Sequence, residues 1–324
     1  MRAPRFRIKL TKKWAIKAGL SALVLAVTLS FLPLDQVWEG FRRLPLTLFF
    51  AVLALFLAGH AVATAKWWML MGQVVPFITA LRAHFAGLAA NLCLPGVAGG
   101  DVVRAGMVWS AATHPGKVMA GSLGDRLVDM LALALVAAGG VAMLAAGDVA
   151  LVAMIVGALT AACVAVFYLL PALMPKLLKL VPLPKKLATL AQTVASAFGE
   201  LGKRPGGLIG ALVLSVAVQA GFVFLTILIA EAIGVEAPRA AWFFAWPLAK
   251  LLAVLPISLA GIGVREASLA ALMTPFGAAA AGVVAASLIW QAVLFCAGAL
   301  GALAWAMTSG AATPGEADLK SEGV

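Results

Sequence analysis

Apolar runs dominate the sequence, and they restrict its possible folds more than any other feature. A helix needs about 20 apolar residues to cross the hydrocarbon core of a bilayer. Runs of this kind cover residues 14–33, 46–65, 119–146, 149–170, 207–230 and 279–307. Only 11% of all residues are charged, whereas soluble domains carry about 25%. We therefore expect an all-α, polytopic transmembrane helical bundle of about six full spans.

The net charge of +11 is concentrated beside these runs. Basic residues gather in the N-terminal segment 1–13 and in the linker 171–206. Such clusters mark the cytoplasmic side of a membrane protein and attract anionic lipid. They do not form the basic face of a nucleic-acid-binding domain. The expected partners are therefore membrane lipids with anionic headgroups, and no nucleic acid.

Two further apolar regions, 79–110 and 240–275, are interrupted by proline and glycine. With a cytoplasmic N-terminus, the run 46–65 returns the chain to the cytoplasm at Lys66-Trp67-Trp68, which we interpret as an interfacial anchor. A single crossing by 79–110 would place the basic linker outside. A re-entrant hairpin keeps the linker inside and predicts that 240–275 is re-entrant from the periplasmic side. Both termini would then face the cytoplasm of a bacterial inner membrane.

The two interrupted regions resemble each other, since AGGDVVRA (98–105) aligns with AGIGVREA (260–267). Their opposite expected orientations indicate inverted repeats, an arrangement typical of transporters whose broken helices surround a substrate. This predicts a transmembrane domain at 14–308, with halves 14–170 and 207–308. A basic amphipathic linker, 171–206, would join the halves, and 309–324 would be a disordered tail.

Irregular backbone at membrane depth is tolerated only where it is buried in protein or lines a cavity. Proline interrupts a helix and glycine permits close backbone approach. The helix ends exposed in this way suit an anionic group. Arg104 and Arg265 add guanidinium groups that match phosphate geometry. The alternative is that the glycines only pack helices together while the charges pair at an interface.

Charged residues also lie within the apolar runs. Asp125 and Asp129 share one helix face, and Arg126 is placed to pair with another segment. These three could bind a cationic headgroup, relay protons, hold a broken helix through an Asp–Arg bridge, or simply extend to the interface. Lys250 adds positive charge, and Glu266 is either the partner of Arg265 or a proton-coupling acid. His60 we interpret as hydrogen-bonded to a neighbouring helix.

No pattern predicts an enzyme or a cofactor. The sequence has no nucleophile–base set, no metal-ligand spacing and no phosphate-binding loop. Its three cysteines lie in apolar surroundings, as small buried side chains do.

Three motifs carry a family resemblance: Asn91 followed by LPGVAGGDVVR, SLGDRLVD (122–129), and LPISLAGIGVREA (255–267). With the span pattern, they resemble the lysylphosphatidylglycerol synthase transmembrane family, which consists of flippase-like integral membrane proteins. The resemblance extends from about residue 10 to 308. It implies movement of a lipid such as aminoacyl-phosphatidylglycerol, a hopanoid or a polyprenyl-linked sugar.

Longer members of that family add a soluble aminoacyl-transferase domain after the membrane part. The sequence here stops at 324, so we do not expect lysyl transfer. The alternative function is a non-transporting scaffold for a lipid-modifying or glycosyl-transfer enzyme. The family pattern together with the charge analysis gives these candidate lipid-pathway residues: Asn91, Pro95, Gly96, Gly99, Gly100, Asp101, Arg104, Asp125, Arg126, Asp129, Lys250, Pro256, Gly261, Gly263, Arg265 and Glu266.

Overall fold

Every regular element that the structure describes is helical, which confirms the predicted all-α class. The computed structural model describes residues 34–93, 99–109, 111–112, 114–144, 169–180, 184–253 and 263–309, with single positions at 150, 154, 158 and 161. The elements are α2 (Leu34–Arg43), α3 (Leu46–Leu70), α4 (Phe77–Cys93), α5 (Gly99–Trp109), α6 (Pro115–Leu144), α8 (Leu170–Leu180), α9 (Lys185–Gly202), α10 (Pro205–Ala232), α11 (Arg239–Ala253), α12 (Val264–Met273), η2 (Thr274–Phe276) and α13 (Ala280–Ser309).

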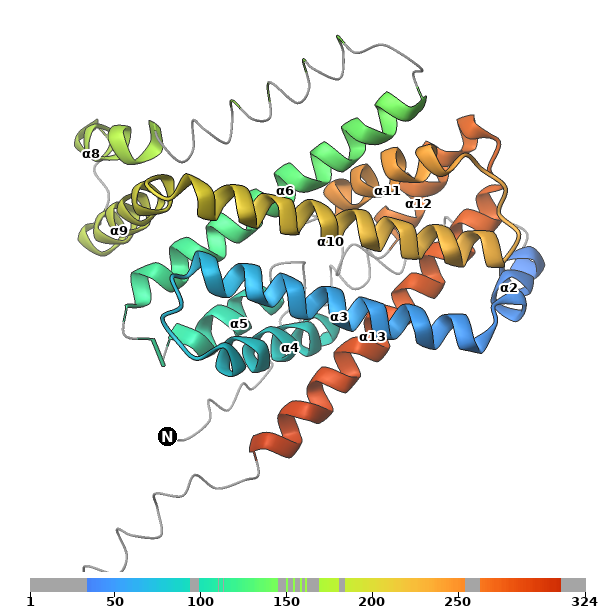
Figure 1. Ribbon diagram of the computed structural model, residues 1–324, viewed down its shortest axis with the longest axis horizontal. Helices are drawn as coiled ribbons and strands as arrows, with labels where there is room; N and C mark the ends of the chain where they lie inside the picture. The colour runs from blue at the N-terminus through green and yellow to red at the C-terminus, as the bar shows by residue number, and fades with distance from the viewer. Residues whose placement is uncertain are drawn as a thin grey trace, which may run out of the picture.

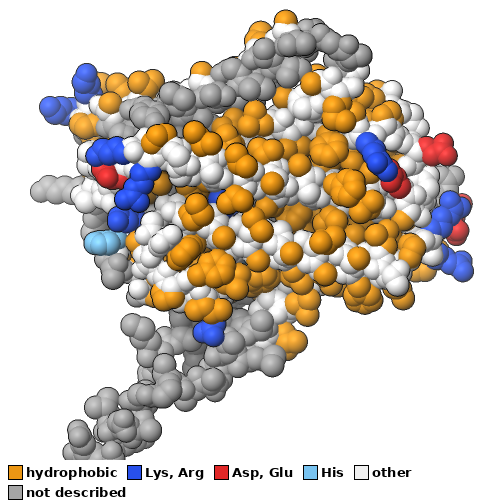
Figure 2. Space-filling view, viewed as in Figure 1, with side chains coloured by type: hydrophobic (Ala, Val, Ile, Leu, Met, Phe, Trp, Pro, Cys, Tyr) orange, Lys and Arg blue, Asp and Glu red, His pale blue; other side chains and the backbone are white. Residues whose placement is uncertain are grey.

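Four of these helices are long and apolar enough to cross a membrane: Leu46–Leu70, Pro115–Leu144, Pro205–Ala232 and Ala280–Leu303. They match four of the predicted runs. The run 14–33 lies outside the described residues, as do most of 149–170, the N-terminal segment and the tail beyond residue 309. In Figure 2, hydrophobic side chains spread over the face between two ends, and most of the charged side chains on this face lie toward those ends. This distribution fits a bundle that lies across a bilayer.

Proline marks the start of three of the long helices. Pro115 and Pro205 are the first residues of α6 and α10, and Pro45 immediately precedes α3. Proline suits such positions because the first N–H groups of a helix have no intrahelical partner. Between these starts, the apolar composition and the packing of neighbouring helices maintain the helices.

The helices follow the same order twice along the chain. A long helix, a two-helix hairpin and a second long helix occur as α3, α4–α5 and α6, and again as α10, α11–α12 and α13. The two leading helices run antiparallel, because Lys66 contacts Ser215 while Gly59 packs against Phe222. Figure 1 shows α3 and α10 lying side by side along the length of the bundle.

The two hairpins open at opposite ends of the bundle. Residues near the outer ends of α4 and α5, Ala80 and Val108, cluster with Trp67 and Met71 of the α3 C-terminal end and with Val118 of early α6. The second hairpin opens where α10 ends and α13 begins. There the Phe244 ring lies 6.2 Å from the Phe276 ring. How deeply either hairpin enters a membrane stays a prediction.

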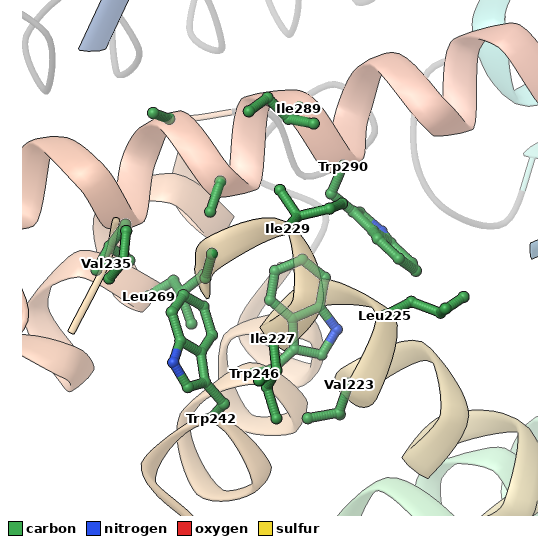
Figure 3. Close-up of a cluster of buried hydrophobic side chains, with 14 of the residues drawn as sticks. Val223, Leu225, Ile227, Ile229, Val235, Trp242, Trp246, Leu269, Ile289 and Trp290 are labelled. Carbon is green, nitrogen blue, oxygen red and sulfur yellow. The ribbon is translucent and has the colours of Figure 1, made fainter. Parts of the chain in front are cut away.

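The main core forms between α10, α11, α12 and α13. Trp242 and Leu269 are buried against Ile229 and Ile289, and Figure 3 shows these side chains converging. Burying a large apolar side chain stabilises a fold by about 1.5–3 kcal/mol in water. Inside a bilayer the corresponding stabilisation comes from close van der Waals packing. The second hairpin is thereby held firmly against its neighbours.

The linker region forms α8 and α9. Phe198 of α9 is buried, and Leu201 lies against Gly124 of α6. Thr193 likewise approaches Gly116 at the start of α6. A helix is therefore present at the predicted amphipathic segment, and one face of it contacts the N-terminal part of α6.

Candidate functional site

The first hairpin is joined by an unusually close backbone approach. A Cβ at Gly100 would lie 2.3 Å from the carbonyl oxygen of Gly87 and 2.5 Å from Oδ1 of Asn91. No larger residue fits there without a shift. Because glycine has no side chain, the Gly100 N–H can approach Oδ1 of Asn91 and donate to it at 2.8 Å. The N–H groups in the first turn of a helix have no acceptor within that helix. Asn91 provides the acceptor for one of these groups in α5.

Arg104 projects from α5 into the interior and is 5% exposed. Its Nη2 donates to Oδ2 of Asp125 at 2.7 Å, and its Nε lies 3.0 Å from Oδ1 of Asp101. The guanidinium also lies over the Trp67 ring, 4.6 Å from the centroid. Arg104 is therefore neutralised by two carboxylates and covered by an aromatic face.

Further ion pairs extend this arrangement across three helices. The Lys66 ammonium lies 3.0 Å from Asp125, pairs with Asp129 and donates to Ser215 at 3.2 Å. Asp129 also accepts from Ser215, and Arg126 pairs with Asp101. We call this group the charge network; it comprises Lys66, Asp101, Arg104, Asp125, Arg126 and Asp129. Its cations and carboxylates are equal in number, as buried charges require.

The interfacial-anchor interpretation of Lys66-Trp67 was wrong. Lys66 is 2% exposed and Trp67 is fully buried. The ammonium does not extend to a headgroup region, because the α6 carboxylates of the charge network attract it inward. The Trp67 indole N–H donates to Ser122 at 3.0 Å, so this ring is also satisfied within the protein.

A second polar cluster surrounds Arg265 on α12. Its Nη2 donates to Glu266 at 2.7 Å and to Gln291 at 2.8 Å, while Nε donates to Ser287 at 3.3 Å. Glu266 accepts from Ser287 at 3.0 Å and from the Gly263 N–H at 2.7 Å. Gly263 has φ +85°, a conformation that favours glycine. Glu266 is therefore both the partner of Arg265 and the N-terminal cap of α12.

Lys250 of α11 differs from the other cations of the interior. Its ammonium donates to Oε1 of Gln219 at 2.8 Å and lies 5.9 Å from the centroid of the Phe222 ring. Among the described residues, no carboxylate lies within ion-pair distance of it. A partly buried cation with only neutral partners is a favourable place for an anion.

Aromatic rings separate the two polar clusters. Phe222 stacks on Phe56 at 5.0 Å, and Trp290 contacts Phe222 at 5.8 Å and Trp246 at 5.4 Å. Trp246 in turn lies 5.7 Å from the Arg265 guanidinium, and Figure 3 shows it beside Trp290. We call Phe56, Phe222, Trp246 and Trp290 the aromatic layer. Lys250 lies next to the aromatic layer, because its ammonium is close to the Phe222 ring.

The structure brings five of the predicted residues into one network, namely Asp101, Arg104, Asp125, Arg126 and Asp129. Asn91, Gly99 and Gly100 lie at the adjoining hairpin, while Gly263, Arg265 and Glu266 form the second cluster. Pro95, Gly96, Pro256 and Gly261 lie outside the described residues. The sequence analysis missed Lys66, His84, Ser215, Gln219, Ser287 and Gln291. Polar residues within the apolar runs were the signal that could have identified several of them.

Two surface grooves lie away from these residues. One of about 800 Å³ runs between the start of α6, α8 and α9, and one of about 600 Å³ lies between α2, the end of α10 and the start of α13. Neither is lined by the charge network or by Lys250.

Comparison with known proteins supports the predicted resemblance. The model of the family described as "Lysylphosphatidylglycerol synthase TM region" matches residues 14–301, and no curated protein matches the chain. The matched region includes both hairpins, the charge network, three of the four membrane-length helices in full and all but the last two residues of the span Ala280–Leu303. This is a multi-pass membrane protein, and the chain belongs to the lysylphosphatidylglycerol synthase TM region family.

Proposed function

We propose that this protein moves a phospholipid or isoprenoid-type lipid between the leaflets of a bacterial cytoplasmic membrane. The single observation that carries the proposal is Lys250, an interior cation whose nearest partners are the neutral Gln219 amide and the Phe222 ring. An intramembrane charge of this kind is a functional-site hypothesis by default. Its complement is an anionic headgroup, and membership of a lipid-related membrane family is consistent with that ligand.

The headgroup phosphate would bind at Lys250, while the acyl chains remain in the bilayer. Arg104 and Arg265 are already neutralised by Asp125 and Glu266. A phosphate at either guanidinium would compete with a carboxylate that is already bound there. We therefore assign these arginines to the opening and closing of the hairpins, and Lys250 to the first contact with the headgroup.

The opposed hairpins provide a way to expose that site to each leaflet in turn. Because α4–α5 opens at one end and α11–α12 at the other, movement of one hairpin at a time would open one side at a time. The aromatic layer would close the path between the two movements.

A second candidate function rests on the groove beside α9. This groove of about 800 Å³ is lined by α6, α8 and α9, and it suits a partner at the membrane surface. The protein would then be a scaffold for a lipid-modifying or glycosyl-transfer enzyme. Changes at the groove would abolish such a role, whereas changes at Lys250 would be tolerated.

Leaflet exchange in proteoliposomes tests the two functions. The wild-type chain is reconstituted with fluorescent phosphatidylglycerol or phosphatidylethanolamine, and the fraction protected from a membrane-impermeant quencher is followed in time. We expect headgroup-selective exchange that Lys250→Gln reduces at least about tenfold, the equivalent of one lost charged contact of 1.4 kcal/mol. Lys203→Gln, which removes an exposed lysine paired with Glu200, is the matched control. Equal exchange by wild type and Lys250→Gln would contradict the assignment.

A further inference from the structure

Two histidines from different helices form a buried chain that ends on the charge network. Nδ1 of His60 on α3 lies 3.0 Å from Nε2 of His84 on α4. Nδ1 of His84 lies 3.3 Å from Nη1 of Arg104 on α5. His84 is only 7% exposed. The three side chains therefore connect three helices through consecutive hydrogen bonds.

Arg104 fixes where the protons of this chain lie. A guanidinium donates hydrogen bonds and cannot accept them, so Nδ1 of His84 must be the acceptor. The proton of neutral His84 is then on Nε2 and is donated to Nδ1 of His60. The proton of neutral His60 is left on its own Nε2. Every unprotonated ring nitrogen of the pair thus already accepts a hydrogen bond.

We propose that His60 and His84 form a proton-binding site whose occupancy is coupled to the position of Arg104, so that protons drive or gate lipid movement. The coupling to lipid rests on the proposed function, whereas the proton site itself does not. Histidine is the side chain whose charge changes near neutral pH, and it recurs in proton relays of membrane transporters.

An added proton must break one of the two hydrogen bonds. On Nδ1 of His84 it would place an N–H against the Arg104 N–H groups and a second cation beside the guanidinium. On Nδ1 of His60 it would oppose the N–H of His84. The proton comes from water and returns to water, and no other bond forms or breaks. Protonation therefore loosens α4 from α5 or from α3.

The surrounding charges connect this event to the headgroup. The cations near the pair are Arg104 on α5, Lys66 on α3, Arg126 on α6 and Lys250 on α11, and the acids are Asp125 and Asp129 on α6. The Phe222 ring of α10 packs against His60 at 5.4 Å. Trp290 of α13 packs in turn against Phe222. An anion bound at Lys250 would cancel one of the cations that repel a proton. Lipid binding would then promote proton uptake.

Nuclear magnetic resonance of the full-length protein in nanodiscs tests the proton site without any transport assay. The chain contains only three histidines, so ¹⁵N-histidine labelling gives few signals. We expect His84 to carry its proton on Nε2 and the His60–His84 pair to take up one shared proton as the pH is lowered. His114, which is exposed at the start of α6, provides the independent reference signal. A pair that takes up no proton at any pH at which the protein stays folded, or the opposite tautomer of His84, would overturn the proposal.

Exchange of fluorescent phosphatidylglycerol under an imposed pH gradient tests the coupling. We expect the wild type and His114→Gln to respond to the gradient, and His84→Gln to lose the response while remaining folded. Glutamine offers Arg104 an acceptor and His60 a donor, but it binds no proton. Wild-type exchange that ignores the gradient would overturn the coupling and leave the lipid function intact. Proton uptake without any lipid exchange would support the site and overturn the lipid function.

Discussion

The Arg104 guanidinium donates to the Asp125 carboxylate at 2.7 Å, and this bond ties α5 to α6 inside the bundle. Asp125 also lies 3.0 Å from the ammonium of Lys66 on α3. One carboxylate thus holds three helices through two cations. If the Asp125 carboxylate is removed, Lys66 and Arg104 stay buried but each loses one of its negatively charged partners.

We therefore expect Asp125→Asn to lower the free energy of unfolding by about 3–5 kcal/mol, as loss of one member of a buried pair does. Reversible unfolding in detergent micelles measures the change. Glu39→Gln is the control, because Glu39 pairs with Arg43 on the exposed surface of α2, where a pair contributes about 0–1 kcal/mol. Similar losses for the two variants would contradict the buried role of Asp125.

Gly100→Ala is expected to destabilise the first hairpin by about 1–3 kcal/mol, as overpacking does. The added methyl group would lie 2.3 Å from the Gly87 carbonyl oxygen. Gly106→Ala on the same helix is the matched control, because nothing lies within 4 Å of its added Cβ. That variant should gain up to about 1 kcal/mol from helix propensity. Thermal unfolding measures the stability of both variants. A loss confined to Gly100→Ala would be due to the close approach of the Gly87 carbonyl, and an equal loss in both variants would be a general effect of alanine in this helix.

Glu266→Gln separates the two roles of this side chain. The amide oxygen still accepts from the Gly263 N–H, but the negative charge beside Arg265 is lost. We expect a larger loss of stability than for Ser287→Ala, which removes a neutral hydrogen bond worth about 1 kcal/mol. Denaturant unfolding of the two variants gives the comparison. A smaller effect of Glu266→Gln would show that the cap outweighs the ion pair.

Labelling of single cysteines tests the re-entrant hairpins. In a background without the native cysteines, we expect cysteines at Gln73 and Ala111 to react from the same side of the membrane as one at Lys203. Cysteines at Glu236 and Ala279 should react from the opposite side. The membrane-impermeant reagent is applied to sealed vesicles of known orientation. Opposite accessibility of positions 73 and 111 would mean that α4–α5 crosses the membrane.

The end of α9 provides a titration at the membrane surface. Lys203 donates to Glu200 at 2.6 Å, and this bond lowers the pKa of the Glu200 carboxyl below its ordinary value. The contribution of the pair to stability is present above the unfolded pKa of Glu200 and is lost as the pH falls through the folded pKa. Lys203→Gln should raise the Glu200 pKa toward its ordinary value, as measured by carboxyl ¹³C shifts. An unchanged pKa would exclude Lys203 as the cause.

The sequence predicted the described spans to within a few residues, because span length follows directly from apolar composition. The interruptions at 79–110 and 240–275 correspond to the α4–α5 and α11–α12 hairpins. Helix α2 (Leu34–Arg43), between the apolar runs 14–33 and 46–65, was not predicted from the sequence. The pairing of Arg265 with Glu266 was one of the two roles considered, and the structure shows it.

Partner choice could not be predicted in the same way. Lys66 beside two tryptophans has the composition of an interfacial anchor, and only the packing of α3 against α6 shows that it turns inward. His60 was expected to hydrogen-bond with a neighbouring helix, but nothing in the sequence identified His84 as the partner. Contacts between residues far apart along the chain depend on helix rotation and crossing geometry, which composition does not determine.

The balance of the charge network affects how the protein experiences the membrane potential. Moving one unit charge across a membrane potential of 100 mV changes its electrostatic energy by about 2.3 kcal/mol. When a group with equal numbers of positive and negative charges moves as one body, its electrostatic energy in the membrane potential hardly changes. The voltage therefore acts chiefly on Lys250, and a bound anionic headgroup would cancel that charge as well. We expect the site with a bound headgroup to be electroneutral until the His60–His84 pair takes up a proton, and both the empty site and the protonated site to feel the voltage.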